Sequence, residues 1–293
     1  MRTQIVLGTF FGAEGKGSTV QWLCKQAIDR GEKPIVVRFS GGQQAGHRII
    51  TNGIEHVCSS FGSGVLLGVP TYLDRNVIID PICMYEEYQQ LVAKGITPVI
   101  YINDNCRITT PYDVNANVND SKVLGHGSCG MGIYHTFKRC EFMKQSEYGI
   151  YSLYGCGITN PSKCLGIARN YYKTEALPEL DKRFVEACEW LSKTAKYEPI
   201  ISGAAFRHYN VNAKEVTYIF EGSHFSTIDS LKYMKENPWV KGIEIFKISA
   251  LAFMVSISLF LYFSISSRFS ASSKRLSSLF RSSIRGVSSS PTS

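Results

Sequence analysis

The chain has 293 residues, of which 44% are hydrophobic, 19% charged and 12% aromatic. This composition suffices to bury a core in one large domain or two smaller ones, and it excludes disordered, collagenous and coiled-coil proteins. Of the net charge of +8, +5 belongs to the last 51 residues, which hold six Lys or Arg and one Glu. The rest of the chain is nearly neutral, which argues against nucleic acid as a partner, because a surface that binds nucleic acid needs clustered basic side chains.

The N-terminal residues lead directly into a strand-like run, without the charged, apolar and small-residue pattern of a secretory signal. Nine cysteines extend from Cys24 to Cys188 with no C-x-x-C pair. Their odd number and wide spacing favour reduced thiols over a disulfide framework. These features predict a cytoplasmic protein.

Strand-like and helix-like stretches alternate up to about residue 242, which predicts an α/β domain over residues 1–242. Strands are expected at residues 5–8, 34–39, 76–79, 98–102 and 216–220, where apolar and β-branched runs are typical of strands covered on both faces. Helices are expected at 18–30 and 83–94, each followed by a glycine that stops it. The predicted fold is a mostly parallel sheet with helices on both faces.

The composition changes after residue 242. Residues 248–265 carry no charge, and 17 of the last 51 residues are serine. An 18-residue apolar run is at the lower limit for crossing a bilayer, and its basic flank would keep the C-terminus on the cytoplasmic side. The other interpretation is that residues 243–293 are a frame-change or truncation product, because the α/β pattern stops in mid-motif. Both interpretations stay open.

A glycine-rich turn joins the first predicted strand to the first helix. Gly8, Gly12, Gly15 and Gly17 allow successive backbone N–H groups to point into one concavity at a helix N-terminus, where Lys16 can meet the outer phosphates of a nucleotide. The standard P-loop motif would need glycine at position 10 and Ser or Thr at position 17, so this turn is P-loop-like only. It predicts a nucleotide-binding fold.

A second glycine-rich turn, residues 38–47, follows the second strand, and two neighbouring parallel strands would bring such turns to one edge of the sheet. The two turns read G-x-E-G-K-G and R-F-x-G-G-x-Q-A-G-H, and together they resemble the paired signature of the adenylosuccinate synthetase family. Residues 63–66, 127–133 and 220–222 resemble further family elements, in order, over about residues 4–229. The sequences of these segments resemble those of a divergent branch of the family. The C-terminal third of the family is missing or replaced in this chain.

The resemblance implies a GTP-dependent, Mg²⁺-using ligase of AMP biosynthesis, a homodimer that joins IMP or a related purine nucleotide to L-aspartate. Matching motif positions gives catalytic roles to Lys16 and His47 and a Mg²⁺-binding role to the Gly46 carbonyl. The implied GTP site consists of Gly12, Ala13, Glu14, Gly15, Lys16, Gly17, Ser18, Gly46, His47 and Arg48. The implied purine-nucleotide site consists of Gln44, Ala45, Ser128, Cys129 and His224.

Ala13 departs from the family pattern, which has an aspartate there that removes the purine N1 proton and binds Mg²⁺. A methyl group can do neither, and a general base is typically worth about 10²- to 10⁴-fold in rate. Three alternatives follow: Glu14 substitutes for the base; purine specificity is relaxed, as in a phage branch that makes 2-aminoadenylosuccinate; or the protein binds GTP or purine nucleotides without catalysis, tethered to a membrane or free.

Overall fold

The computed structural model of the protein describes residues 2–8, 14–120, 125, 128–145, 158–222 and 243–248. Gly12, Ala13, His224 and residues 249–293 of the predicted site and tail lie outside these ranges. In the part of the chain described, no helix is long and apolar enough to cross a membrane. The predicted apolar segment 248–265 falls outside it except for its first residue.

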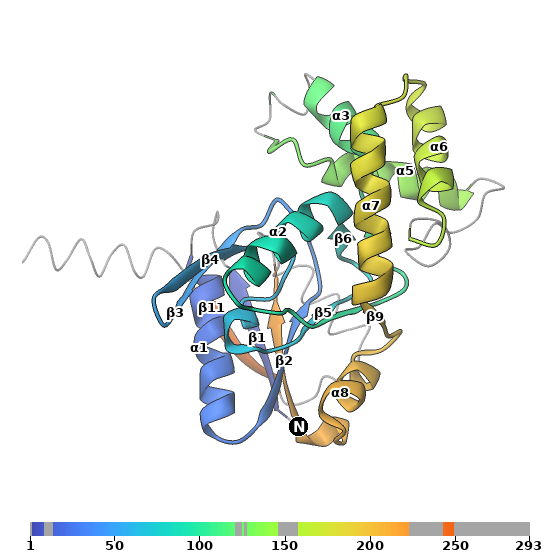
Figure 1. The fold of residues 1–293 in the computed structure, drawn as a ribbon. Coiled ribbons are helices and arrows are strands. Elements are labelled where there is room, and N and C mark those ends of the chain that lie inside the picture. The colour runs from blue at the N-terminus through green and yellow to red at the C-terminus, as the bar shows by residue number, and fades with distance from the viewer. Residues whose placement is uncertain are drawn as a thin grey trace, which may run out of the picture. The chain divides into compact units, whose positions relative to one another are not determined.

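A seven-stranded sheet forms the centre of the fold, in the order β11-β1-β10-β2-β5-β7-β9 (Figure 1). All six pairs of neighbouring strands are parallel, which confirms the predicted fold class. The strands are β1 (Arg2–Gly8), β2 (Lys33–Arg38), β5 (Thr71–Leu73), β7 (Ile100–Ile102), β9 (Lys196–Tyr197), β10 (Val216–Glu221) and β11 (Ile243–Ile248).

Two smaller strand pairs complete the β-structure. An antiparallel hairpin joins β3 (His47–Thr51) to β4 (Ile54–Cys58), and its Asn52-Gly53 turn has positive φ at both residues, as a two-residue hairpin turn requires. A separate parallel pair joins β6 (Ile78–Ile79) to β8 (Arg107–Ile108). The strand expected at 76–79 is therefore shorter than predicted and lies outside the main sheet.

Seven α-helices are found among the described residues: α1 (Lys16–Asp29), α2 (Pro81–Ala93), α3 (Pro111–Asn119), α5 (Ile133–Gln145), α6 (Pro161–Tyr172), α7 (Pro178–Thr194) and α8 (Ile201–Tyr209). Two short 3-10 turns are also present: η1 (Val65–Leu67) lies between β4 and β5, and η3 (Ala213–Glu215) lies between α8 and β10. The helix expected at 18–30 begins two residues earlier, because Gly15 adopts φ 76° and turns the chain directly into Lys16. The helix expected at 83–94 likewise begins early, at Pro81, because the Asp80 carboxylate caps it.

Helices cover both faces of the central strands. Val6, Val36 and Ile219 pack with α1 residues on one face. Their neighbours in sequence, which point the opposite way, pack with Ile201, Ala204 and Ala205 of α8. Burial on both faces explains the apolar runs at residues 5–7 of β1, 35–37 of β2 and 218–220 of β10, and the three strands were predictable for that reason.

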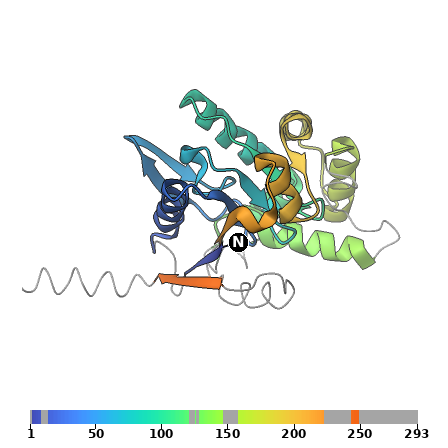
Figure 2. The ribbon, with the colours of Figure 1, turned by 90° about the horizontal axis from the view of Figure 1, so that it is seen from below.

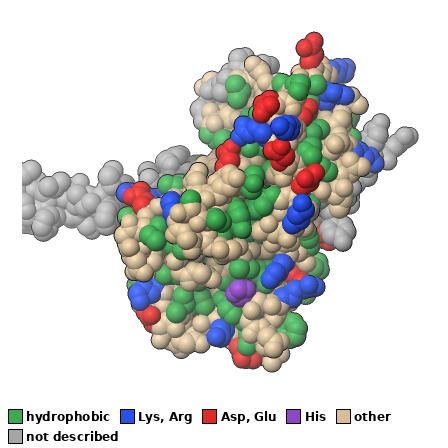
Figure 3. Space-filling view, viewed as in Figure 1, with side chains coloured by type: hydrophobic (Ala, Val, Ile, Leu, Met, Phe, Trp, Pro, Cys, Tyr) green, Lys and Arg blue, Asp and Glu red, His purple; other side chains and the backbone are tan. Residues whose placement is uncertain are grey.

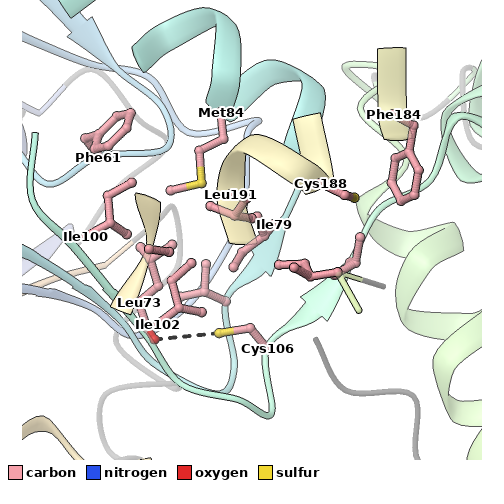
Figure 4. Packing of buried hydrophobic residues seen from close by; sticks show 14 of the residues in the cluster. Phe61, Leu73, Ile79, Met84, Ile100, Ile102, Cys106, Phe184, Cys188 and Leu191 are labelled. Atoms are coloured by element: carbon pink, nitrogen blue, oxygen red, sulfur yellow. Dashed lines mark hydrogen bonds between the residues drawn. The ribbon is translucent and has the colours of Figure 1, made fainter. Parts of the chain in front are cut away.

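The largest hydrophobic cluster lies at the β5–β7 side of the sheet, under α2 and α7 (Figure 4). Met84 of α2 and Leu191 of α7 meet Leu73 and Ile102 there. The Cys106 thiol donates to the Leu73 carbonyl at 3.6 Å. This core connects the sheet to the helical layer of α3, α5, α6 and α7 (Figure 1).

At the other end of the sheet, β11 runs parallel to β1, from Thr3 opposite Ile243 to Gly8 opposite Ile248 (Figure 2). The sequence analysis placed the end of the α/β domain at residue 242. The sheet also includes residues 243–248, which lie beyond that predicted boundary. On the face seen in Figure 3, acidic and basic side chains are interspersed, in keeping with the nearly neutral composition of this part of the chain.

Candidate nucleotide site

Three strand ends converge at one edge of the sheet. Glu221, the last residue of β10, lies opposite Val6 of β1 on one side and Arg38 of β2 on the other. The glycine-rich turns that follow β1 and β2 therefore leave the sheet on either side of Glu221. β1 and β2 are therefore not the neighbouring strands that the sequence suggested, because β10 lies between them. Both turns still leave from the carboxyl edge of the sheet, where α/β proteins bind ligands. Residues 9–13 of the first turn lie outside the described residues.

Lys16 lies at this edge as the first residue of α1. Its Nζ is 2.7 Å from Oε2 of Glu14, and both side chains are almost fully buried, with 3% and 0% exposed. A Cβ on Gly8 would come within 2.7 Å of the Lys16 Nζ, so a glycine at the end of β1 is what leaves room for the ion pair. The ammonium thus lies buried at the N-terminus of α1, and its charge is balanced by Glu14.

His47 begins β3 and packs against the first turn of α1. A Cβ on Gly17 would lie 2.7 Å from the His47 Cβ and 3.1 Å from the Ser63 hydroxyl, so Gly17 permits this close approach. The His47 Nδ1 is hydrogen-bonded to Oε1 of Glu221. The two predicted catalytic residues, Lys16 and His47, therefore lie on segments that pack against each other at Gly17.

Glu221 is 1% exposed and has more than one partner. The Ser63 backbone N–H donates to its Oε2 at 2.9 Å, and the Ser63 hydroxyl donates to its Oε1. Burial by itself raises the pKa of the Glu221 carboxyl, but His47, the Arg38 charge and the Ser63 hydroxyl outweigh burial and lower it. Glu221 is thus a buried, ionised carboxylate.

The loop that carries Ser63 is anchored from α2. Glu87 accepts the backbone N–H groups of residues 59, 60 and 61 at 3.0, 2.6 and 3.4 Å. From the sheet side, the Arg38 guanidinium donates to the Ser59 and Phe61 carbonyls. The position of Ser63 below Glu221 is therefore fixed on both sides by charged side chains.

His56, Cys58 and Glu87 form a buried group whose ligand atoms lie within 4.8 Å of one another. The arrangement does not suit a metal ion. Glu87 already accepts three N–H groups, burial raises the pKa of the Cys58 thiol well above its ordinary value, and the Lys94 ammonium is 3.1 Å from Nδ1 of His56. The group acts as a hydrogen-bonded anchor for the loop.

The turn after β2 meets the loop before α5. A Cβ on Gly42 would lie 2.6 Å from Cδ1 of Ile133, so these two segments are in direct contact. Gln44 Oε1 is buried here without a hydrogen-bond partner, which leaves an acceptor free for a ligand. The Ser128 hydroxyl is bonded to the Asn117 amide at 3.0 Å, whereas Cys129 is exposed. The structure thus brings the Gln44 turn and the Ser128–Cys129 loop to one place.

The remaining predicted site residues differ in exposure. Ala45 is buried, and Gly15, Ser18 and Gly46 are exposed. The Arg48 guanidinium points to Glu55 across the hairpin, with bonds of 2.6 and 2.7 Å. That ion pair is solvent-exposed. The Arg48 guanidinium, which the resemblance assigns to GTP binding, is thus paired with Glu55 in this structure.

Glu221 and Ser63 received no role from the sequence. Both lie in the family-like segments at 220–222 and 63–66, so the signal for them was present as motif resemblance. Their contact with His47 was not visible, because Glu221 is separated from His47 by 174 residues and from Ser63 by 158.

Residues 5–150 match the family model described as adenylosuccinate synthetase. An adenylosuccinate synthetase of Acetivibrio thermocellus is 35% identical over 132 residues, which are 44% of this chain and 30% of that protein. One of Paraburkholderia xenovorans is 26% identical over 236 residues, 78% of this chain and 51% of that protein. The chain therefore spans about half or less of the length of these curated relatives.

Two solved structures share the fold. The fully ligated adenylosuccinate synthetase of Plasmodium falciparum is 20% identical with a TM-score of 0.53, over 76% of this chain and 52% of that one. The succinoaminodeoxyadenylate synthetase of cyanophage S-2L, bound to dGMP and dATP, is 14% identical with a TM-score of 0.57, over 84% and 63%. Residues 5–150, which include the two glycine-rich turns at the carboxyl edge of the sheet, are thus similar to the adenylosuccinate synthetase family.

Proposed function

We propose that the protein is a purine-nucleotide ligase of the adenylosuccinate synthetase type, which joins IMP or a related purine nucleotide to L-aspartate at the expense of GTP. The observation that carries this proposal is the convergence of Lys16 and the His47–Glu221 pair at the carboxyl edge of the sheet. A cytoplasmic homodimer belongs to the same proposal, by analogy with the family.

Lys16 is proposed to contact the GTP phosphates. Phosphoryl transfer depends mainly on positioning and charge stabilisation, which a buried ammonium at a helix N-terminus can provide. Because Glu14 is paired with Lys16, a polyphosphate would take over the ammonium from this carboxylate. The pairing also opposes the idea that Glu14 replaces the missing base at Ala13, since its carboxylate is directed to Lys16.

One of the predicted site residues offers an oxygen ligand suited to Mg²⁺. The Gly46 carbonyl is a hard oxygen on an exposed residue, whereas Ala13 has no side-chain oxygen and Glu221 is engaged by His47 and Ser63. The ion would be held by that carbonyl together with phosphate oxygens and water. When bound, it would neutralise charge on the phosphates.

His47 is proposed to act on the purine side. With Nδ1 bonded to Glu221, Nε2 is the nitrogen left to donate a proton toward O6 of the purine nucleotide. Gln44 and the Ser128–Cys129 loop would bind that nucleotide, and the free Gln44 Oε1 offers it an acceptor.

A second candidate function is nucleotide binding without catalysis, and Ala13 is the observation that favours it. Relaxed purine specificity is the other consequence of Ala13. Supplying GTP, aspartate and either IMP or dGMP, and measuring the succinylated product of each, separates these readings. A product formed from IMP or from dGMP identifies the substrate. If neither nucleotide gives a product, nucleotide binding without catalysis is supported.

The phosphate contact is tested by thermal unfolding with GTP and Mg²⁺. We expect GTP to raise the melting temperature of the wild-type chain and Lys16→Ala to abolish that rise. Lys25→Ala is the matched control, because Lys25 lies on the same helix in an exposed pair with Asp29. An equal GTP shift in the Lys16 and Lys25 variants would remove the assignment of Lys16 to the phosphates.

A further inference from the structure

Glu221 is a buried carboxylate to which neither the motif resemblance nor the proposed phosphate site gives a task. We propose that Glu221, held by Ser63, is a positioning residue that fixes the His47 imidazole with Nδ1 protonated and Nε2 free for the substrate. The proposal rests on the proposed ligase function for what Nε2 does, but the state of the imidazole can be tested without turnover.

The geometry gives Glu221 a fixed orientation. Its Oε2 accepts the Ser63 backbone N–H at 2.9 Å, and its Oε1 is shared by the Ser63 hydroxyl and His47 Nδ1. Ser63 is fully buried and Glu221 is 1% exposed, so water does not compete for these oxygens. The carboxylate is therefore a rigid acceptor placed at one edge of the imidazole ring.

The charge state of Glu221 determines the tautomer of His47. The pKa of Glu221 is lowered, despite burial, by His47, Arg38 and Ser63, so the carboxyl is ionised and can only accept hydrogen bonds. His47 Nδ1 must then carry a hydrogen in order to bond to this carboxylate, and Nε2 is the nitrogen left to face the substrate.

The other titratable groups near the pair do not replace Glu221. Lys16 and Arg38 are cations, from α1 and β2, and cannot accept a hydrogen bond from the imidazole. Cys24 and Cys58 are thiols whose pKa values burial raises well above the ordinary value, and the charge of Glu221 raises them further. Glu14 is an anion, but its carboxylate is paired with Lys16. Glu221 is thus the carboxylate that contacts the imidazole in the described part of the chain.

The direct test is NMR spectroscopy of the chain with ¹⁵N-labelled histidine under conditions where the imidazole is neutral, in which His47→Gln identifies the His47 signals. We expect the wild-type imidazole to show a protonated Nδ1 and an unprotonated Nε2. Glu221→Gln should mix the two tautomers, because a neutral amide can donate a hydrogen bond to Nδ1 as well as accept one from it. An unchanged tautomer in Glu221→Gln would overturn the proposal.

Two further variants control the measurement. Glu221→Asp retains the charge with a shorter side chain, so it should keep the Nδ1-protonated tautomer better than Glu221→Gln does. Asp113→Asn removes a fully buried carboxylate of α3 that is paired with Arg139 of α5, and it should leave the His47 signals unchanged. If Asp113→Asn mixes the His47 tautomers as much as Glu221→Gln does, the effect is general destabilisation and the proposal is wrong.

Turnover gives an independent readout if the ligase function holds. Glu221→Gln should lower kcat by about 10- to 100-fold, as removal of a group that orients a functional histidine commonly does, with little change in the KM for GTP. A chain with no activity would refute the ligase proposal alone, since the NMR measurement of the tautomer still decides the role of Glu221.

Discussion

We expect Arg139→Met to destabilise the helical layer that carries the Ser128–Cys129 loop. Arg139 of α5 donates from Nε and Nη2 to the two oxygens of Asp113 on α3, each at 2.8 Å, and from Nη2 to the Ile108 carbonyl at 2.8 Å. Arg139 is 2% exposed and Asp113 is fully buried. The substitution keeps most of the apolar stem but removes the charge and all three donated bonds.

The magnitude follows from what remains around Asp113. Its carboxylate would still accept from the Thr110 backbone N–H at 2.7 Å, the Thr110 hydroxyl at 2.8 Å and the Tyr172 hydroxyl at 2.8 Å. Losing one partner of a buried ion pair typically costs about 3–5 kcal/mol, and the three surviving bonds favour the lower end, about 3 kcal/mol. For a domain of this size that corresponds to a fall in melting temperature of about 6–12 °C.

Urea and thermal unfolding of the variant measure this loss, and the chain offers a matched control. Arg48 makes the same two-bond pair with Glu55, at 2.6 and 2.7 Å, but in solvent. Arg48→Met should leave the unfolding midpoint almost unchanged, because exposed pairs contribute little. The double variant Asp113→Asn/Arg139→Met should recover part of the stability, since it no longer buries a lone charge.

Equal midpoints for Arg139→Met and Arg48→Met would refute this reasoning, because burial would then add nothing to the pair. A double variant less stable than Arg139→Met would also contradict it. In that case the hydrogen bonds of Asp113, rather than its unpaired charge, would account for the loss of stability.

Two other outcomes can be measured on the same chain. A hydrogen bond from Arg30, with a smaller contribution from Thr217, lowers the pKa of the Glu32 carboxyl from 4.5 to about 2. Its contribution to the free energy of unfolding is present above pH 4.5 and is lost as the pH falls toward 2, so Glu32→Gln should flatten this part of the urea-midpoint curve. Cys129 is exposed in the proposed purine-nucleotide site, so IMP should slow its alkylation by iodoacetamide, measured by peptide mass spectrometry. Alkylation at the same rate with and without IMP would place the nucleotide away from Cys129.

Local sequence was sufficient for the centre of the fold. β1, β2 and β10 each contain an apolar run of three residues because both of their faces are covered, and α1 and α2 end in glycine-containing turns. The Gly8–Gly17 and Arg38–His47 turns were recognisable as ligand loops, because a glycine-rich turn between a strand and a helix is a local feature of the chain. The sequence also indicated, from the order of its motifs, that these turns belong to one site.

Other elements were not predictable from such patterns. The β3–β4 hairpin has a clear Asn52-Gly53 turn, but its strands alternate exposed and buried residues over only five positions each. The strands β5, β8 and β9 have two or three residues, too few for a period to be visible. Strand β11 follows the composition change at 242 and is defined by its pairing with β1.

In the candidate site, too, some features could be predicted from local sequence and others could not. The sequence by itself determined that Lys16 and His47 belong to glycine-rich loops with a purine-ligase signature, because those loops are contiguous in the chain. Only the tertiary structure decided that Glu221 and Ser63 hold the His47 imidazole and that Glu14 balances Lys16. Residues 158 or more positions apart meet because β10 lies between β1 and β2 in the sheet, and strand order is a property of long-range packing that no local pattern encodes.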